Sequence, residues 1–323
     1  MSATLGAFEH RRVVVLGGSG FIGSHVVAAL VVAGAEVVSF DARMPDYLPP
    51  GAVAVQGDIT DAAAVTSVIE GTDAIFALAG GLGPLRSMGE PTADLMSSCA
   101  AQLVLLEAVR AAASTASVVF AGSRLEYGPA VALPVNELHP LRPESPYAIH
   151  KAACSSYYET YARLYELRTS VLRLSNPYGA HVPGAPRDAG YGILNLLIDT
   201  ALGGDCIQLY GGGTQIRDFV HVSDVARAAL AASATPQAAG EVFNIGSGEP
   251  CSLRAAAELI LELSGSGTID GDVPWPTAAA AVETGDFYFD VSKAAEILGW
   301  RPSVDLRDGL AGVVRAMAEG HAR

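Results

Sequence analysis

Tyr147 and Lys151 lie four residues apart in a chain whose only other lysine is Lys293. Residues at positions i and i+4 of a helix lie on the same face, so the ammonium group can lie close to the phenol. The positive charge would favour the ionised phenol, which makes Tyr147 a candidate general base. The same spacing also occurs in ordinary amphipathic helices, so this interpretation depends on the rest of the chain.

A glycine-rich turn near the amino terminus indicates a dinucleotide site. It follows the apolar run 12–16 and precedes a helical pattern that starts at residue 21. We expect Gly17 to permit the tight bend, Gly20 to let the backbone approach a pyrophosphate, and Gly23 to let the helix pack closely on the strand. The free N–H groups at the start of the helix would face the phosphates.

The second apolar run, 36–40, is followed by Asp41, at about the distance where a ribose-binding acid is expected. Asp41 would accept hydrogen bonds from the ribose hydroxyls and repel a 2′-phosphate, which favours NAD over NADP. Arg43 leaves NADP open as an alternative, because an arginine at this place could bind the 2′-phosphate.

Composition excludes several classes of protein. The net charge of −14 argues against a nucleic-acid partner, and no uninterrupted apolar run approaches the roughly 20 residues of a membrane span. The start of the chain has no secretory pattern, and the four cysteines show neither metal-ligand spacing nor a disulfide framework. We therefore expect a cytoplasmic, soluble protein with no metal site.

Apolar runs and helical patterns alternate along the first half of the chain. Strands are expected near 12–17, 36–40, 53–56, 74–78, 117–121 and 170–174, and helices near 21–33, 61–70, 92–113 and 147–167. This alternation predicts an α/β fold, a Rossmann-type doubly wound parallel sheet covered on both faces.

The pattern of the sequence changes after Asn176, where we expect a loop rich in proline and glycine from Pro177 to Gly192. We expect a smaller, discontinuous C-terminal substrate-binding subdomain. Residues 11–176 and 217–245 would form the NAD-binding domain, and residues 177–216 and 246–323 the substrate-binding subdomain.

The chain carries an ordered set of motifs along almost its whole length. They are Gly17–Gly23, Gly57–Ile59, Leu78–Gly80, Ser123 before Tyr127–Gly128, Tyr147 with Lys151, Arg173–Gly179, Arg217–Asp224 and Val291–Trp300. In this set the chain resembles the extended short-chain dehydrogenase/reductases of the nucleotide-sugar epimerase and dehydratase group, most nearly UDP-glucose 4-epimerase-like proteins.

The resemblance implies a catalytic set of Ser123, Tyr147 and Lys151, with Ser123 and Lys151 assisting the tyrosine base. It implies an NAD site formed by Gly17, Gly20, Phe21, Ile22, Gly23, Asp41, Arg43, Asp58, Ile59, Leu78, Ala79, Gly80 and Ser98 together with Tyr147 and Lys151. Two alternatives remain: Ser123 could be a turn residue at a strand end, and Asp58 could cap the helix that begins near Asp61.

Asn176 and Arg217 occupy positions that contact the substrate diphosphate in the family, and Arg217 could instead pair with Asp218. The second family arginine is missing, because Val282 and Glu283 stand in its place. Arg124 is unusual for the family and could reach a phosphate or carboxylate of the substrate; it could also be a surface residue.

The residues after Ser123 discriminate among the reactions of the family. Dehydratases place an Asp-Glu pair there, and decarboxylating relatives have a glutamate where Leu125 stands. Glu126 lies one place later, and in a strand-like segment it would point to the opposite face. Dehydration and decarboxylation are therefore disfavoured.

We predict an NAD-dependent epimerase that acts at C4 of a UDP-hexose-type substrate through a transient 4-keto intermediate. The alternatives are an NAD(P)-dependent 4-ketosugar reductase or sugar dehydrogenase, and a non-catalytic dinucleotide-binding protein. The resemblance also implies a homodimer formed through the helices near 92–113 and 147–167, with an apolar stripe of Tyr157, Tyr158, Tyr161 and Leu164.

Overall fold

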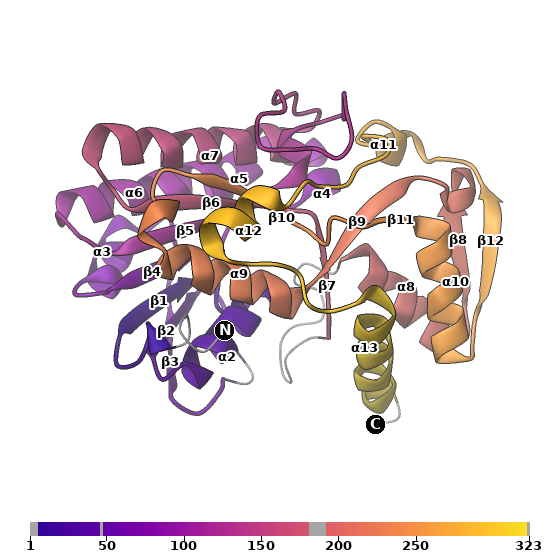
Figure 1. Cartoon of the computed structure of the whole chain (residues 1–323), viewed down its shortest axis with the longest axis horizontal. Helices are drawn as coiled ribbons and strands as arrows, with labels where there is room; N and C mark the ends of the chain where they lie inside the picture. The colour runs from indigo at the N-terminus through magenta and orange to yellow at the C-terminus, as the bar shows by residue number, and fades with distance from the viewer. Residues whose placement is uncertain (1–5, 46–47, 181–191, 322–323) are drawn as a thin grey trace.

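The computed structural model describes residues 6–45, 48–180 and 192–321 (Figure 1). Its main sheet has seven strands, all parallel, in the order β10-β6-β5-β4-β1-β2-β3. In chain order they are β1 (Arg12–Leu16), β2 (Glu36–Asp41), β3 (Ala52–Gln56), β4 (Ala74–Ala77), β5 (Ser117–Ser123), β6 (Thr169–Leu174) and β10 (Val242–Ile245). The six predicted strands are present, and β10 is an additional one. The Rossmann-type fold class is confirmed.

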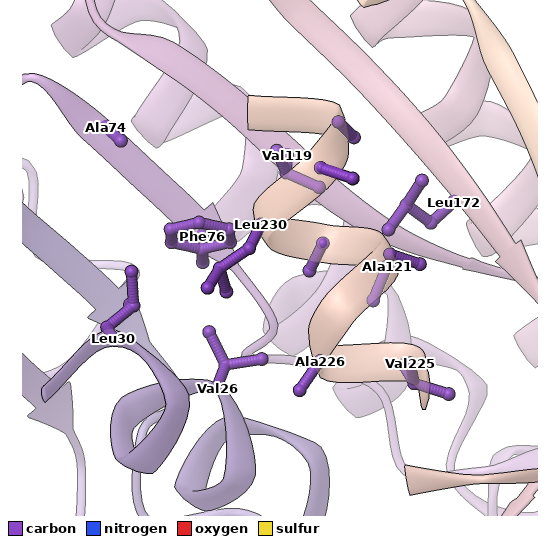
Figure 2. Close-up of a cluster of buried hydrophobic side chains, with 14 of the residues drawn as sticks. Val26, Leu30, Ala74, Phe76, Val119, Ala121, Leu172, Val225, Ala226 and Leu230 are labelled. Carbon is purple, nitrogen blue, oxygen red and sulfur yellow. The ribbon is translucent and has the colours of Figure 1, made fainter. Parts of the chain in front are cut away.

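Helices cover both faces of this sheet (Figure 1). On one face lie α2 (Phe21–Val32), α9 (Val222–Ala234) and α12 (Ser292–Leu298), and on the other α3 (Ala62–Ile69), α6 (Ala101–Ala111) and α7 (Pro146–Tyr165). Strand β1 shows the alternation that this requires, since Val13 and Val15 join the first core and Val14 and Leu16 the second. Figure 2 shows the first core, where Val26 and Leu230 meet Phe76.

The helix predicted near 92–113 is continuous from Pro91 to Ala111 but changes its winding on the way. It consists of α5 (Pro91–Leu95), a π-helical turn (Met96–Ala100) and α6. Among the described helices it is the one long and apolar enough to cross a membrane by length and composition, and half of its apolar window is buried inside the protein. Its buried side chains pack on α3, α7 and the sheet.

A second group of elements follows β6. A three-stranded sheet joins β11 (Pro250–Ser252), β9 (Ile216–His221) and β7 (Asn176–Tyr178), and β12 (Thr268–Val273) pairs with β8 (Cys206–Tyr210). Helices α8 (Ile193–Leu202), α10 (Leu253–Ser264) and α13 (Leu306–His321) enclose a separate core. Strand β9 contributes to both cores, since Phe219 joins this one and Val220 the first core of the main sheet.

The remaining elements are short. They are α4 (Pro84–Gly89), α11 (Thr277–Ala280) and three 3-10 turns at Arg124–Glu126, Gly211–Gly213 and Pro236–Ala238. Of the loop predicted from Pro177 to Gly192, the first two residues belong to β7, and residues 181–191 lie outside the described part of the chain.

Candidate active site

The predicted site residues gather at one edge of the main sheet. Gly17 follows β1, Asp41 ends β2, Leu78 follows β4 and Ser123 ends β5. These strands are parallel, so their carboxyl ends lie at the same edge, where doubly wound folds bind their ligands.

The glycine turn packs so closely against neighbouring backbone that Gly17 and Gly23 have no room for a side chain. Gly17 has a φ of +84°, and a Cβ there would lie 2.6 Å from the backbone nitrogen of Ala79. Gly20 precedes α2 without a capping side chain, and the first turn of that helix contains no acidic residue. The start of the helix, at Phe21 and Ile22, therefore suits an anion such as a pyrophosphate.

Asp41 is fixed beside this turn. One carboxylate oxygen accepts a hydrogen bond from the N–H of Ser19 and the other from the N–H of Arg43, both at 3.1 Å. The hydroxyl of Ser19 in turn donates to the carbonyl of Arg43 at 3.1 Å. Each oxygen of Asp41 keeps a further lone pair, so the carboxylate can accept hydrogen bonds from ribose hydroxyls.

Asp58 does not cap the helix that follows it. Asp61 caps α3, while Asp58 accepts hydrogen bonds from the backbone and hydroxyl of Thr60, both at 2.8 Å. These hydrogen bonds lower the pKa of Asp58. Ile59 next to it is buried against α3 and the sheet.

Side chains from two helices fix the loop after β4. The carbonyl of Ala79 accepts a hydrogen bond from Gln102 at 3.0 Å, and Gln102 accepts one from the hydroxyl of Tyr158 at 2.6 Å. Gly80 has a φ of +105°, and a Cβ there would lie 2.5 Å from the carbonyl oxygen of Ser97. Ser98 is therefore next to the loop, within the π-helical turn. No motif in the sequence indicated that Gln102 and Tyr158 would position this loop.

The candidate base and its lysine are positioned by the start of α7. Ser145 caps this helix by accepting a hydrogen bond from the N–H of Ala148 at 3.2 Å, so Tyr147 lies in the first turn and Lys151 in the next. The Nζ of Lys151 lies 5.9 Å from the ring centre of Tyr147 and donates to the carbonyl of Ala121 at 2.7 Å. Ala121 precedes Ser123 by two residues on β5, so this hydrogen bond joins α7 to the strand that carries the serine.

Glu126 is a further residue of the site, and the expectation of a strand-like segment there was wrong. Residues 124–126 form a 3-10 turn in which Glu126 accepts a hydrogen bond from the N–H of Ser123 at 2.7 Å. Its second oxygen accepts hydrogen bonds from Ser155 and Arg173, both at 2.8 Å. Both oxygens of this buried carboxylate therefore accept hydrogen bonds, and the one from Ser123 holds the backbone of the serine in place. The glutamate three residues after a serine was the available signal, since that spacing is typical of a capping box.

Asp94 and His150 also contribute to the site without a sequence signal. The buried carboxylate of Asp94 lies 2.6 Å from Nδ1 of His150 on α7, and its other oxygen accepts a hydrogen bond from the N–H of Leu82 at 2.6 Å. A Cβ at Gly81 would lie 2.9 Å from the ring of Tyr147. Asp94 therefore holds the glycine loop against Tyr147, the candidate base.

The predicted substrate residues meet next to Ser123. Arg124 donates to Asn176 at 3.4 Å and to Thr284 at 3.0 Å. Arg217 forms an ion pair with Glu283 at 2.6 Å. Its partner is therefore not Asp218, which is buried and accepts hydrogen bonds from backbone groups of other segments. Within the described residues there is no cluster of three or more potential metal ligands.

Comparison with known proteins agrees with this arrangement. Residues 13–246 match the model of the NAD dependent epimerase/dehydratase family. A UDP-glucose 4-epimerase of Mycolicibacterium smegmatis is 31% identical over 313 residues, which cover 94% of this chain and 97% of that protein.

Two solved structures are also similar. A UDP-glucose 4-epimerase from Thermotoga maritima with UDP-glucose has a TM-score of 0.86 at 29% identity, and it covers 96% of this chain and 99% of its own. MoeE5 in complex with UDP-glucose and NAD has a TM-score of 0.83 at 30% identity, with the same coverage of 96% and 99%. The chain therefore belongs to the NAD-dependent epimerase/dehydratase family of extended short-chain dehydrogenase/reductases, and its cofactor is NAD.

Proposed function

We propose that this enzyme epimerises a UDP-hexose-type nucleotide sugar at C4 through a transient 4-keto intermediate. The observation that carries the proposal is the hydrogen bond from Lys151 to Ala121, which brings the helix of Tyr147 to the end of the strand that carries Ser123. The similarity to UDP-glucose 4-epimerases along nearly the whole chain supports it.

In this proposal Tyr147 removes the proton of the C4 hydroxyl, while Ser123 holds that hydroxyl by a hydrogen bond. Bound NAD supplies the redox chemistry, because it takes a hydride from the sugar and later returns it. Lys151 uses one N–H for Ala121 and keeps two for the cofactor ribose. The hydroxyl of Tyr147 forms no hydrogen bond within the described residues, so it is available to the substrate.

The cofactor would occupy the sheet edge from the glycine turn to α7. We assign the pyrophosphate to the turn at Gly17, Gly20 and Gly23 with Phe21 and Ile22, and the adenosine ribose to Asp41 with Arg43 alongside. Asp58 and Ile59 would contact the adenine, and Leu78, Ala79, Gly80 and Ser98 would line the groove towards Tyr147 and Lys151.

The substrate would lie between this edge and the second group of elements. We assign Ser123, Arg124 and Asn176 to its binding, with Arg217 close to them, and residues 177–216 and 246–323 to a substrate-binding subdomain. Glu126 supports the choice of epimerisation, because its buried carboxylate accepts hydrogen bonds from Ser123, Ser155 and Arg173 and so has a positioning role.

Mass spectrometry of the small molecules released by denaturing freshly purified protein would test the proposal. An epimerase returns the hydride in each turnover and should keep its cofactor, so we expect NAD close to one equivalent per chain and a nucleotide sugar. Release of neither compound, together with rapid exchange of added NAD, would favour a dehydrogenase that exchanges its cofactor.

We also propose a homodimer formed through α5 and α7. Leu95, Met96, Ile149, Tyr157 and Leu164 are exposed on these helices and the turn between α5 and α6. The predicted stripe needs a correction, because Tyr158 is fully buried and bonded to Gln102. Sedimentation analysis should find a dimer that Leu164→Asp dissociates, and a monomeric wild-type protein would contradict this.

A cytoplasmic location is proposed from the cysteines. Cys99, Cys154, Cys206 and Cys251 are all free thiols in the structure, which suits a reducing compartment. Fractionation of the source cells should find the protein with cytoplasmic enzymes, and recovery from an oxidising compartment would contradict this assignment.

A further inference from the structure

The positive charge of Arg217 is already used inside the protein. Its Nη1 donates to the carbonyls of Ile216 and Gly285, both at 2.8 Å, and its Nη2 donates to both oxygens of Glu283 at 2.6 Å. The side chain is only 8% exposed. The two terminal nitrogens of Arg217 therefore cannot bind a second anion unless the side chain of Glu283 moves away.

Arg124 has the opposite environment. Its two hydrogen bonds go to the neutral side chains of Asn176 and Thr284, and its guanidinium lies 5.3 Å from the ring centre of Phe287. Within the described part of the chain, no carboxylate lies within salt-bridge distance of it. Burial and the nearby charge of Arg217 lower the pKa of Arg124 to about 10. An anion placed beside this guanidinium would stabilise its charge.

The guanidinium of Arg124 is also held in a fixed place. Arg124 follows Ser123 directly, Asn176 begins β7, and Thr284 comes from the segment after α11. Three segments far apart in the sequence therefore orient one cation next to the serine. Such preorganisation suits an arginine that binds a phosphate or carboxylate through parallel hydrogen bonds, because little side-chain freedom is lost on binding.

We propose that Arg124, and not Arg217, supplies the charge that binds an oxyanion of the substrate. The oxyanion is a phosphate of the diphosphate or the carboxylate of an acidic sugar. Glu283 determines this specificity by pairing with Arg217, so that of these two arginines only Arg124 is available to the oxyanion. The inference rests on the proposed function, because it assigns a group of the nucleotide sugar to Arg124.

Calorimetric titration of the NAD-loaded protein with UDP, UDP-glucose and UDP-glucuronate tests this. Arg124→Gln should weaken binding by about 10- to 100-fold, since a charged hydrogen-bonding partner is lost. A similar loss for all three ligands would assign Arg124 to the diphosphate, and a loss confined to UDP-glucuronate would assign it to the carboxylate. The matched control is Arg307→Gln, which removes an exposed arginine paired with Glu262 outside the site.

A change in the Arg217–Glu283 ion pair should have the opposite effect on ligand affinity. Glu283→Gln should tighten binding by about tenfold, because it frees Nη2 of Arg217 and removes a negative charge. The double variant Arg217→Gln, Glu283→Gln should weaken binding less than Arg124→Gln does. The proposal is overturned if Arg124→Gln binds all three ligands like the wild type, or if the double variant loses more affinity than Arg124→Gln.

Inorganic pyrophosphate and free glucuronate separate this inference from the proposed function. If the wild-type protein binds no UDP-sugar, the proposed function fails, but the NAD-loaded protein should still bind one of the two anions more weakly after Arg124→Gln. Equal binding of both anions by wild type and variant, or no binding by either, would remove Arg124 as an oxyanion site.

Discussion

Glu126 accepts a hydrogen bond from the backbone N–H of Ser123 at 2.7 Å and, through its other oxygen, one from Ser155 on α7 at 2.8 Å. One buried carboxylate thus sets the position of the serine relative to the helix that carries Tyr147 and Lys151. Arg173 balances its charge at 2.8 Å.

Glu126→Gln should lower kcat by about 10- to 100-fold with little change in NAD content, because small displacements of a catalytic group are costly. Removing one partner of a buried ion pair also destabilises a protein, by about 3–5 kcal/mol. The double variant Glu126→Gln, Arg173→Gln therefore serves as the control for folding. A folded variant with wild-type kcat would show that Ser123 does not depend on Glu126.

Tyr147→Phe should reduce turnover to about 1% or less while NAD remains bound, since a general base contributes a factor of about 100 to 10,000. The variant loses only the hydroxyl, and the ring still packs on Gly81. Activity and cofactor content should be measured on the same preparation. Retention of more than about a few per cent of the activity would remove Tyr147 from the role of base.

NAD should bind at least about tenfold more tightly than NADP, a difference of about 1.4 kcal/mol, because Asp41 repels a 2′-phosphate. Asp41→Ala should narrow this difference. The test is fluorescence titration of cofactor-free protein with both dinucleotides. Equal affinities in the wild type would mean that Arg43 dominates the ribose pocket, and would favour an NADPH-dependent reductase.

Asp224 should stabilise the fold above about pH 4, the ordinary value of an aspartate. Burial alone would raise the pKa of Asp224, but hydrogen bonds from Arg227, Ser303 and Val304 leave it below its ordinary value. A lowered pKa in the folded state gives stability that is present above the unfolded value and lost as the pH falls through the folded one.

Asp224→Asn should therefore cost about 1.5–3 kcal/mol at pH 7, and the difference from wild type should shrink as the pH falls below about 4. Trp300 donates to the carbonyl of Asp224 at 2.9 Å, so its fluorescence can follow unfolding by urea. A difference that does not depend on pH would show that the charge of Asp224 is unimportant.

The sequence predicted those features that depend on local pattern. Strands β1 to β6 are apolar runs, and Tyr147 with Lys151 are spaced by one turn of a single helix. Strand β10 was missed because it comes after strands β7 to β9, outside the alternation of strands and helices in the first half of the chain.

Contacts between segments that are far apart in the sequence could not be predicted from local sequence pattern. Glu283 lies 66 residues from Arg217, and His150 lies 56 residues from Asp94. The resemblance to the family indicates that Glu283 stands where an arginine is expected, but only the folded chain shows that it pairs with Arg217. For the same reason, the sequence did not predict the role of Gln102 and Tyr158, whose hydrogen bonds hold the carbonyl of Ala79 in place.

The fate of the C4 hydrogen tests the central claim most directly. The enzyme should be incubated with UDP-glucose deuterated at C4, and the products should be analysed by mass spectrometry and NMR while absorbance reports NADH. We predict UDP-galactose that keeps deuterium at C4, with no net NADH. Stoichiometric accumulation of NADH with a keto sugar, or no conversion of UDP-glucose, UDP-galactose and their uronic acids, would contradict the assignment as a C4 epimerase.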